Sequence, residues 1–199
     1  MKKLFAVLLA CALLVVALPT SADAYVTKLD EAKGWWGDDT IDFSFDSTMN
    51  NSQYNIYMSD WSAAMRDWNC TEIPLTYTYS SDSDATVLLG VVYLSETTTY
   101  GVTNCYFRGG DYTHVIRYAD SFINLSPPDI DNSKVARSAA AHEIGHLNGL
   151  LHENDEAKTD SLMYVQRNRS TCYSPDDDSI DGVNFFYRGW DFDTWQRRP

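Results

Sequence analysis

Basic residues are scarce in this chain, which carries 15 Lys and Arg against 28 Asp and Glu and has a formal net charge of −13. Proteins that bind nucleic acids neutralise phosphates with clustered Lys and Arg. The charge balance therefore excludes nucleic acid as an expected partner. Acidity at this level mainly favours solubility outside the cell.

Cysteine is also scarce, with 4 in the chain and no C-x-x-C pair. Cys11 lies in the N-terminal apolar segment, where a lipoprotein-type signal is a less favoured alternative because the apolar stretch before it is short. Cys70, Cys105 and Cys172 remain, and an exported protein permits one disulfide among them with one thiol left over. The sequence alone does not choose the pair.

Only one long apolar run is present, at residues 4–18. It follows Met-Lys-Lys and precedes the small-residue step Ala-Asp-Ala at 22–24, which is the pattern of a cleaved secretory signal. The run is shorter than the ~20 residues that a membrane-spanning helix needs. We therefore predict a signal peptide over 1–24 and one secreted domain over 25–199, with no membrane association after the signal is removed.

Histidine is the last scarce residue, and 3 of the 4 lie within the segment 142–152, which reads H-E-x-x-H-x-x-G-x-x-H. His142 and His146 are four positions apart, so a helix places them on one face within reach of one ion. His152 reaches the same ion only if the helix stops before it. Gly149 supplies the stop, because glycine adopts a left-handed backbone at little cost.

This residue set predicts a catalytic zinc site. Three neutral ligands, His142, His146 and His152, leave the fourth tetrahedral position open for water. Glu143 follows the first ligand and is placed to take a proton from that water as the general base. The alternatives are ordinary surface histidines on a helix, or a degenerate and inactive copy of such a site.

The hydrophobic pattern predicts strands first and helices later, which indicates an α+β domain. We expect strands at 41–45, 74–80, 85–94, 112–118 and 121–125, with a loop over 95–104. We expect helices at 53–69, at 134–148 after a cap at Asn132 or Ser133, and at 176–187. The tryptophans of the first helix fit core packing better than a sugar-binding platform.

The motif, followed by Ser161-Leu162-Met163-Tyr164, resembles the metzincin metallopeptidases. The short gap between His152 and Met163 resembles the matrixin branch, including its small secreted bacterial members. This resemblance implies a twisted mixed sheet of about five strands, an active-site helix, and a small C-terminal subdomain with a methionine turn and a closing helix.

The resemblance also implies a function, zinc-dependent endopeptidase activity on a protein or peptide substrate. His142, His146 and His152 match the ligands of one catalytic Zn²⁺, and Glu143 matches the general base. Met163 matches the turn methionine, which supports the site without binding the metal. We expect a monomer.

Several residues depart from the family pattern. Asn148 stands where leucine is usual, which bears on local packing. Glu153 follows the third histidine, where vertebrate matrixins favour serine. Val165 occupies the place of the tyrosine ligand of astacins, so we expect no tyrosine on the metal. His114, the one histidine outside the motif, is expected to be a strand residue and not a ligand.

Other functions and ions stay open at this point. A non-catalytic zinc-containing secreted binding protein is one alternative, and a narrow-specificity hydrolase of cell-wall peptides is another. An edge strand within 112–118 is a candidate for aligning substrate by β-pairing. Calcium is a second candidate ion, although solvated loop carboxylates are the preferred interpretation of the aspartates that would bind it. These are Asp82, Asp84, Asp129, Asp131 and Asp176 to Asp178.

Overall fold

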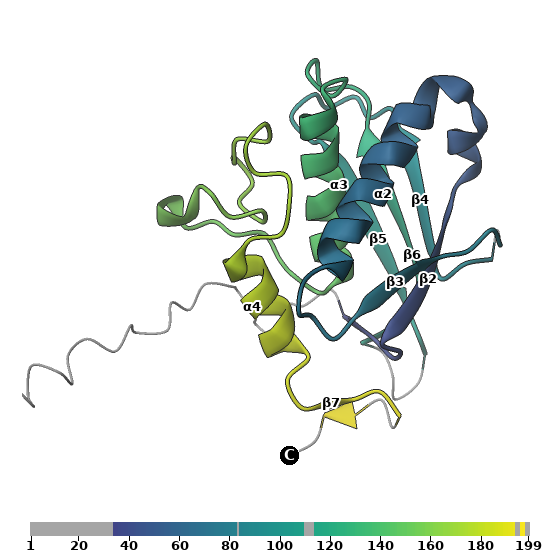
Figure 1. The fold of residues 1–199 in the computed structure, drawn as a ribbon, viewed down its shortest axis with the longest axis vertical. Coiled ribbons are helices and arrows are strands. Elements are labelled where there is room, and N and C mark those ends of the chain that lie inside the picture. Colours follow the sequence, from purple (N-terminus) through teal and green to yellow (C-terminus); the bar gives the residue numbers. More distant parts are fainter. Residues whose placement is uncertain (1–33, 83, 110–113, 194–195, 198–199) are drawn as a thin grey trace, which may run out of the picture.

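The computed structural model describes residues 34–82, 84–109, 114–193 and 196–197. The predicted signal peptide lies outside these residues. Helix α2 (Asn55–Asn69) and helix α3 (Ser133–Leu147) lie side by side against the sheet (Figure 1). Both helices fall where their apolar spacing predicts them. Among the described residues, no helix is both long enough and apolar enough to cross a bilayer.

A 6-stranded sheet forms the other layer, in the order β1-β6-β4-β2-β3, with β5 paired to β6. Its pairings are parallel, except that β5 runs antiparallel to β6. The result is a mixed α/β arrangement with a mostly parallel sheet, consistent with the predicted α+β class. The strands are β1 (Trp35–Trp36), β2 (Thr40–Phe45), β3 (Thr76–Tyr79), β4 (Val87–Val92), β5 (Gly101–Phe107) and β6 (Val115–Asn124).

Two expectations about the strands were wrong. Residues 115–118 and 121–124 of the two expected strands belong to one strand, β6, because Ala119 and Asp120 continue the ladder with β4. The expected loop 95–104 contains the start of β5, which packs one face against α3. The mixed polar sequence of this segment does not indicate a strand. The described part of 112–118 therefore lies inside the sheet, and the antiparallel edge is β5.

The chain after α3 builds a smaller region beside the two layers (Figure 1). It contains a long irregular segment with the short helix η4 (Glu156–Lys158), and then α4 (Asp177–Phe186), which confirms the predicted closing helix. After α4, the short strand β7 (Trp190–Asp191) pairs with β8 (Gln196–Arg197). Two further short helices, η1 (Ser47–Asn50) and η2 (Ser52–Tyr54), precede α2.

Tryptophans of α2 join the layers, as the core-packing interpretation expects. Trp61 and Trp68 are fully buried. The indole N–H of Trp61 donates to the Gly90 carbonyl of β4 at 3.1 Å, and that of Trp68 donates to the Ala141 carbonyl of α3 at 2.9 Å. A buried indole needs such an acceptor. Both side chains therefore fill the core, and Trp61 ties α2 to the sheet while Trp68 ties α2 to α3.

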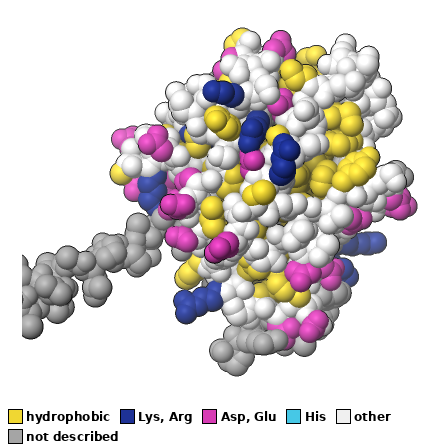
Figure 2. Space-filling view, viewed as in Figure 1, with side chains coloured by type: hydrophobic (Ala, Val, Ile, Leu, Met, Phe, Trp, Pro, Cys, Tyr) yellow, Lys and Arg dark blue, Asp and Glu magenta, His cyan; other side chains and the backbone are white. Residues whose placement is uncertain are grey.

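The surface agrees with the acidic composition. Figure 2 shows Asp and Glu side chains at several separate places on this face, with Lys and Arg between them. No two of Cys70, Cys105 and Cys172 are joined in a disulfide. The fold is therefore stabilised by packing and hydrogen bonds in the part of the chain that the structure describes.

Candidate metal centre

Helix α3 carries the first two histidines and ends where the sequence predicts. The Asn132 side chain caps its start by accepting from the Lys134 N–H. At the other end Gly149 has φ +90°, and the Leu150 N–H donates to the Gly145 carbonyl at 3.0 Å. This left-handed residue reverses the chain just after the helix. The reversal returns His152 toward the helix.

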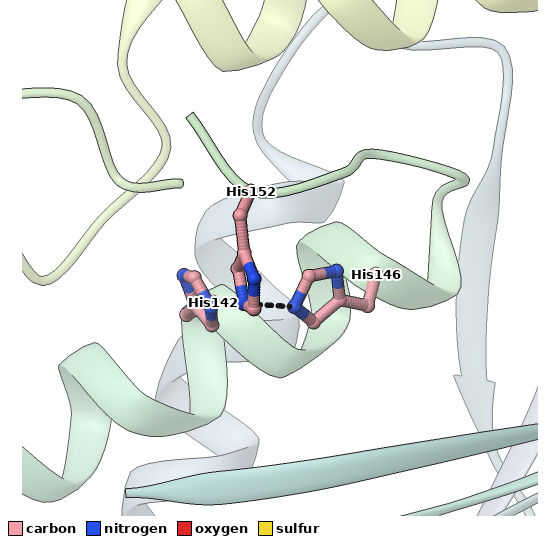
Figure 3. A group of neighbouring side chains, drawn as sticks. All are labelled: His142, His146 and His152. Carbon is pink, nitrogen blue, oxygen red and sulfur yellow. Dashed lines mark hydrogen bonds between the residues drawn. The ribbon is translucent and has the colours of Figure 1, made fainter. Parts of the chain in front are cut away.

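The three predicted ligands converge (Figure 3). One nitrogen from each of His142, His146 and His152 lies within 4.8 Å of the others. The Nε2 atoms of His146 and His152 are 3.1 Å apart. Two nitrogens that each lie ~2.0–2.1 Å from a tetrahedral zinc are themselves about 3.3–3.4 Å apart. The trio is therefore close enough to bind one metal ion.

Backbone carbonyls orient two of the rings. The Nδ1 atom of His142 lies 2.8 Å from the Leu162 oxygen, and that of His146 lies 2.8 Å from the Leu150 oxygen. A carbonyl only accepts, so each ring carries its proton on Nδ1 and presents the lone pair of Nε2 toward the other rings. Such outer hydrogen bonds fix the tautomer of a metal-binding imidazole. The donor set therefore fits a divalent cation.

Burial keeps His142 neutral. His142 is 6% exposed, and this burial lowers its pKa well below the ordinary value, with the charges of Arg167 and His146 acting in the same direction. A protonated imidazole cannot bind a metal. At neutral pH, His142 is in the form that a metal requires.

Met163 lies directly beneath the ligand helix. A Cβ atom added to Gly145 would come 2.4 Å from the Met163 sulfur, so a larger residue there would require the Met163 side chain to move. The Glu153 N–H donates to the Met163 carbonyl at 2.9 Å, which ties the segment after His152 to the methionine segment. Lys158 Nζ lies 3.3 Å from a Glu153 carboxylate oxygen and 3.7 Å from one of Asp178 in α4.

Glu143 is held next to the trio by the edge strand. The Thr103 hydroxyl of β5 donates to Glu143 Oε2 at 2.7 Å. A Cβ atom on Gly101 would lie 2.6 Å from Glu143 Oε1, so the strand backbone passes against the carboxylate. The carboxylate is 4% exposed. A buried carboxylate beside three imidazoles is placed to exchange a proton with a molecule bound there.

A pocket of about 210 Å³ opens at this site. Its walls come from the rim 98–101, the helix face with Ala139, His142 and Glu143, the turn residue His152, and the chain after Met163. The last segment contributes Val165, Arg167 and Arg169. Two of the predicted ligands and the predicted base therefore share one cavity with two arginines.

The remaining predicted residues lie elsewhere. His114 is exposed just before β6, with its ring 5.7 Å from that of Trp35, and is not part of the trio. Among described residues, the trio is the one group of three or more His, Cys, Asp or Glu side chains close enough to hold an ion. The loop aspartates considered for calcium form no such group there. Asn148 is fully buried, and its Oδ1 accepts from the Tyr77 hydroxyl at 2.8 Å.

Sequence reasoning missed several residues that line the pocket or contact Glu143. Thr103 and Gly101 lie in the segment expected to be mostly loop. Arg167 and Arg169 carry no motif, and only their closeness to Met163 along the chain could have suggested them. Compared with models of protein families and with curated proteins, the chain matches none.

Proposed function

We propose that the protein is a secreted zinc-dependent endopeptidase of the metzincin type, close to the matrixin branch. The observation that carries the proposal is the convergence of His142, His146 and His152 on one point beside the buried carboxylate of Glu143. A site that only stores or structurally holds zinc has no need for a base at that position. The placement of Met163 beneath Gly145 is a second point in favour of this family.

Zinc is the proposed ion because three neutral imidazole nitrogens suit it and leave a ligand position open. His142, His146 and His152 would hold it. When bound, the ion supplies Lewis-acid chemistry, which polarises a peptide carbonyl and acidifies water.

Glu143 performs the proton transfers of the proposed reaction. Its carboxylate accepts a proton from the attacking water and later delivers it to the leaving nitrogen of the cleaved peptide bond. The Thr103 hydroxyl, which donates to Glu143 Oε2, holds the carboxylate in one orientation for both steps. The helix Ser133–Leu147 and the edge strand together exclude water from the side of Glu143 that faces the core.

Strand β5 aligns the substrate in this proposal. Among the described strands it pairs only with β6, so its other edge presents N–H and C=O groups next to the pocket. An extended peptide that pairs with this edge passes Gly101 and therefore Glu143. Main-chain pairing of this kind suits hydrolysis within a protein chain.

The test is Glu143→Ala, with the exposed Glu72→Ala as the matched control. We expect Glu143→Ala to lose peptide hydrolysis by about 10²- to 10⁴-fold, because it removes the general base. Zinc content, measured by metal analysis of the purified protein, should stay at one ion per chain in both variants. Glu72→Ala should cleave a casein or peptide-library substrate like the wild type.

Three results would contradict the proposal. Full activity of Glu143→Ala would remove the assigned base. A wild-type protein that holds zinc but cleaves no peptide in the library would be the non-catalytic binding protein instead. Activity that persists after a chelator has removed the metal would show that the hydrolysis does not depend on the metal site.

A further inference from the structure

Two arginines face the pocket from the chain that follows Met163. Arg167 and Arg169 both line the cavity, together with the rim 98–101 and the ligand His142. The substrate residue beside the scissile bond enters this cavity if the site is a peptidase, since Glu143 lines it as well. The charge of these two side chains therefore bears on which substrate the site accepts.

Arg167 is fixed in place. It is 3% exposed, its Nε donates to the Ser138 hydroxyl at 3.2 Å, and its Nη2 donates to the Ser138 carbonyl at 3.0 Å. Its Nη1 donates to the Tyr164 carbonyl at 3.2 Å. Burial lowers its pKa to about 10, so the guanidinium stays positive at neutral pH. These three bonds use three of its five N–H groups.

Arg169 lies at the pocket wall, and not all of its N–H groups are hydrogen-bonded. Its guanidinium carbon is 3.8 Å from the centre of the Tyr100 ring, and its Nη2 donates to the Val165 carbonyl at 3.0 Å. Its Nε is buried and has no hydrogen-bond partner among the described residues. A buried donor without a partner costs free energy that a ligand oxygen would recover.

Neither guanidinium forms an ion pair with a carboxylate of the described residues. The Tyr100 hydroxyl donates to Asp129 at 2.8 Å, and the charge of Asp129 favours the charged form of Arg169 without an ion pair between them. Buried or half-buried positive charges without a direct ion-pair partner are costly in a folded protein. They are also unusual in a chain of net charge −13, where acids are in excess.

We infer that this pocket binds a carboxylate of the substrate next to the bond that is cleaved. Arg169 binds the carboxylate directly, and the nearby positive charge of Arg167 adds to the attraction. The inference rests on the proposed peptidase function and specifies its substrate class. Arginine suits this role because its planar fork matches the two oxygens of a carboxylate. An apolar substrate side chain would leave the buried Nε of Arg169 without a partner, and an amide would supply an acceptor but no negative charge.

The carboxylate has two possible sources, an Asp or Glu side chain or the free end of a peptide. Peptides with both ends blocked, in pairs that differ only by Glu or Gln near the scissile bond, test the side chain. Gln peptides with a free or an amidated C-terminus next to that bond test the chain end. Mass spectrometry of the products locates the cleaved bond in each set.

We expect the wild type to cleave blocked Glu peptides with a kcat/KM on the order of tenfold to hundredfold above their Gln partners, the usual effect of a hydrogen bond to a charged group. Arg169→Gln should remove this ratio, and Arg169→Glu should reverse it. The matched control is Arg66→Gln, an exposed arginine of α2, which should keep the wild-type ratio. If the wild type prefers only peptides with a free C-terminus, the pocket binds the terminal carboxylate of a peptide and not an acidic side chain.

Binding to the Glu143→Ala variant keeps the inference separate from catalysis. Fluorescence anisotropy with labelled blocked peptides should show tighter binding of the Glu peptide, and Arg169→Gln in the same background should abolish the difference. Cleavage with no carboxylate preference in either set would overturn the inference and leave the peptidase standing. Selective binding without cleavage by the wild type would overturn the peptidase and leave the carboxylate pocket.

Discussion

Gly149 is the residue that brings the third histidine back to the first two. Its φ of +90° lies in the region where an L side chain is strained, and a Cβ atom there would come 2.8 Å from Phe186 Cε1 and 3.2 Å from the Gly34 carbonyl oxygen. The backbone strain and the steric contacts of a side chain at this position both arise three residues before His152. A substitution at Gly149 therefore changes backbone strain and ligand position together.

We expect Gly149→Ala to lower the free energy of unfolding by about 1–3 kcal/mol, because a non-glycine residue is held in a sparsely populated conformation. Its zinc affinity should fall as well, since His152 is displaced. Urea denaturation and a competitive zinc titration measure the two effects. The control is Gly109→Ala, where an added Cβ meets nothing within 4 Å. Equal stability and zinc affinity in the two variants would contradict this role for Gly149.

At the same scale, the convergence of the three histidines beside Glu143 was predictable because these residues lie within one short segment of the sequence. His142, Glu143, His146 and His152 occupy one helix and one turn, so spacing alone places them. Thr103 and Arg169 were not predictable in this way. Their roles depend on β5 and the segment after Met163 folding against α3. These contacts join segments far apart in the chain, so the residues around Thr103 and Arg169 do not predict them.

At the scale of elements, the contact between α2 and α3 contains a buried acid. Asp60 of α2 is 4% exposed, and the Ser133 hydroxyl at the start of α3 donates to its Oδ1. Its Oδ2 has no hydrogen-bond partner in the described part of the chain. Burial raises the pKa of this carboxyl, against the opposing effects of the Ser133 hydrogen bond and the charge of Arg137.

A raised pKa in the folded state means that the folded protein takes up this proton at a higher pH than the unfolded chain does. The charged carboxylate therefore costs stability at neutral pH, and this cost disappears as the pH falls through the raised value. We expect Asp60→Asn to be more stable than the wild type at pH 7, with a gap that narrows on acidification. Urea midpoints from pH 7 to pH 4 measure the gap.

The comparison uses Asp181→Asn, an exposed carboxylate of α4, as the baseline for general effects of losing one charge. A gap between Asp60→Asn and the wild type that widens on acidification would contradict the sign of the shift. An unchanged gap would show that the Asp60 carboxyl is not penalised by its burial.

Elements with a strong period were predictable, and those with mixed polarity were not. The apolar spacing of α2, the alanine-rich face of α3 and the apolar run of β4 all follow from burial. Strand β5 presents Thr103 to the helix and Asn104 to solvent, so it lacks the alternation of hydrophobic residues that marks a half-buried strand. The sequence predicts two strands in place of β6, with a break at 119–120 where Asp120 interrupts the apolar residues, yet the ladder of β6 is continuous.

At the scale of the whole molecule, a bound metal ion adds stability by mass action. Zinc that binds the folded chain and not the unfolded one stabilises it by about 2.7 kcal/mol at a free concentration of 100 times Kd. For a domain of this size that corresponds to about 5–10 °C in Tm. We expect this rise on adding zinc to chelator-treated protein, measured by differential scanning fluorimetry.

His152→Ala is the matched variant for this measurement, because it removes one ligand outside the helix and leaves α3 intact. Its Tm should respond weakly to zinc. A wild-type Tm that is the same with zinc and with chelator would contradict the metal site, whereas an equal response in His152→Ala would exclude that histidine as a ligand.

The hydrogen bond from the Glu153 N–H to the Met163 carbonyl has a consequence for metal binding and release. The turn that bears the third imidazole is tied to its neighbours by a main-chain bond and by the Lys158 bridges, and none of these ties uses a metal ion. We therefore expect the turn to keep its position when the metal is removed. Chelation should then be fully reversible and should leave a folded protein that binds zinc again.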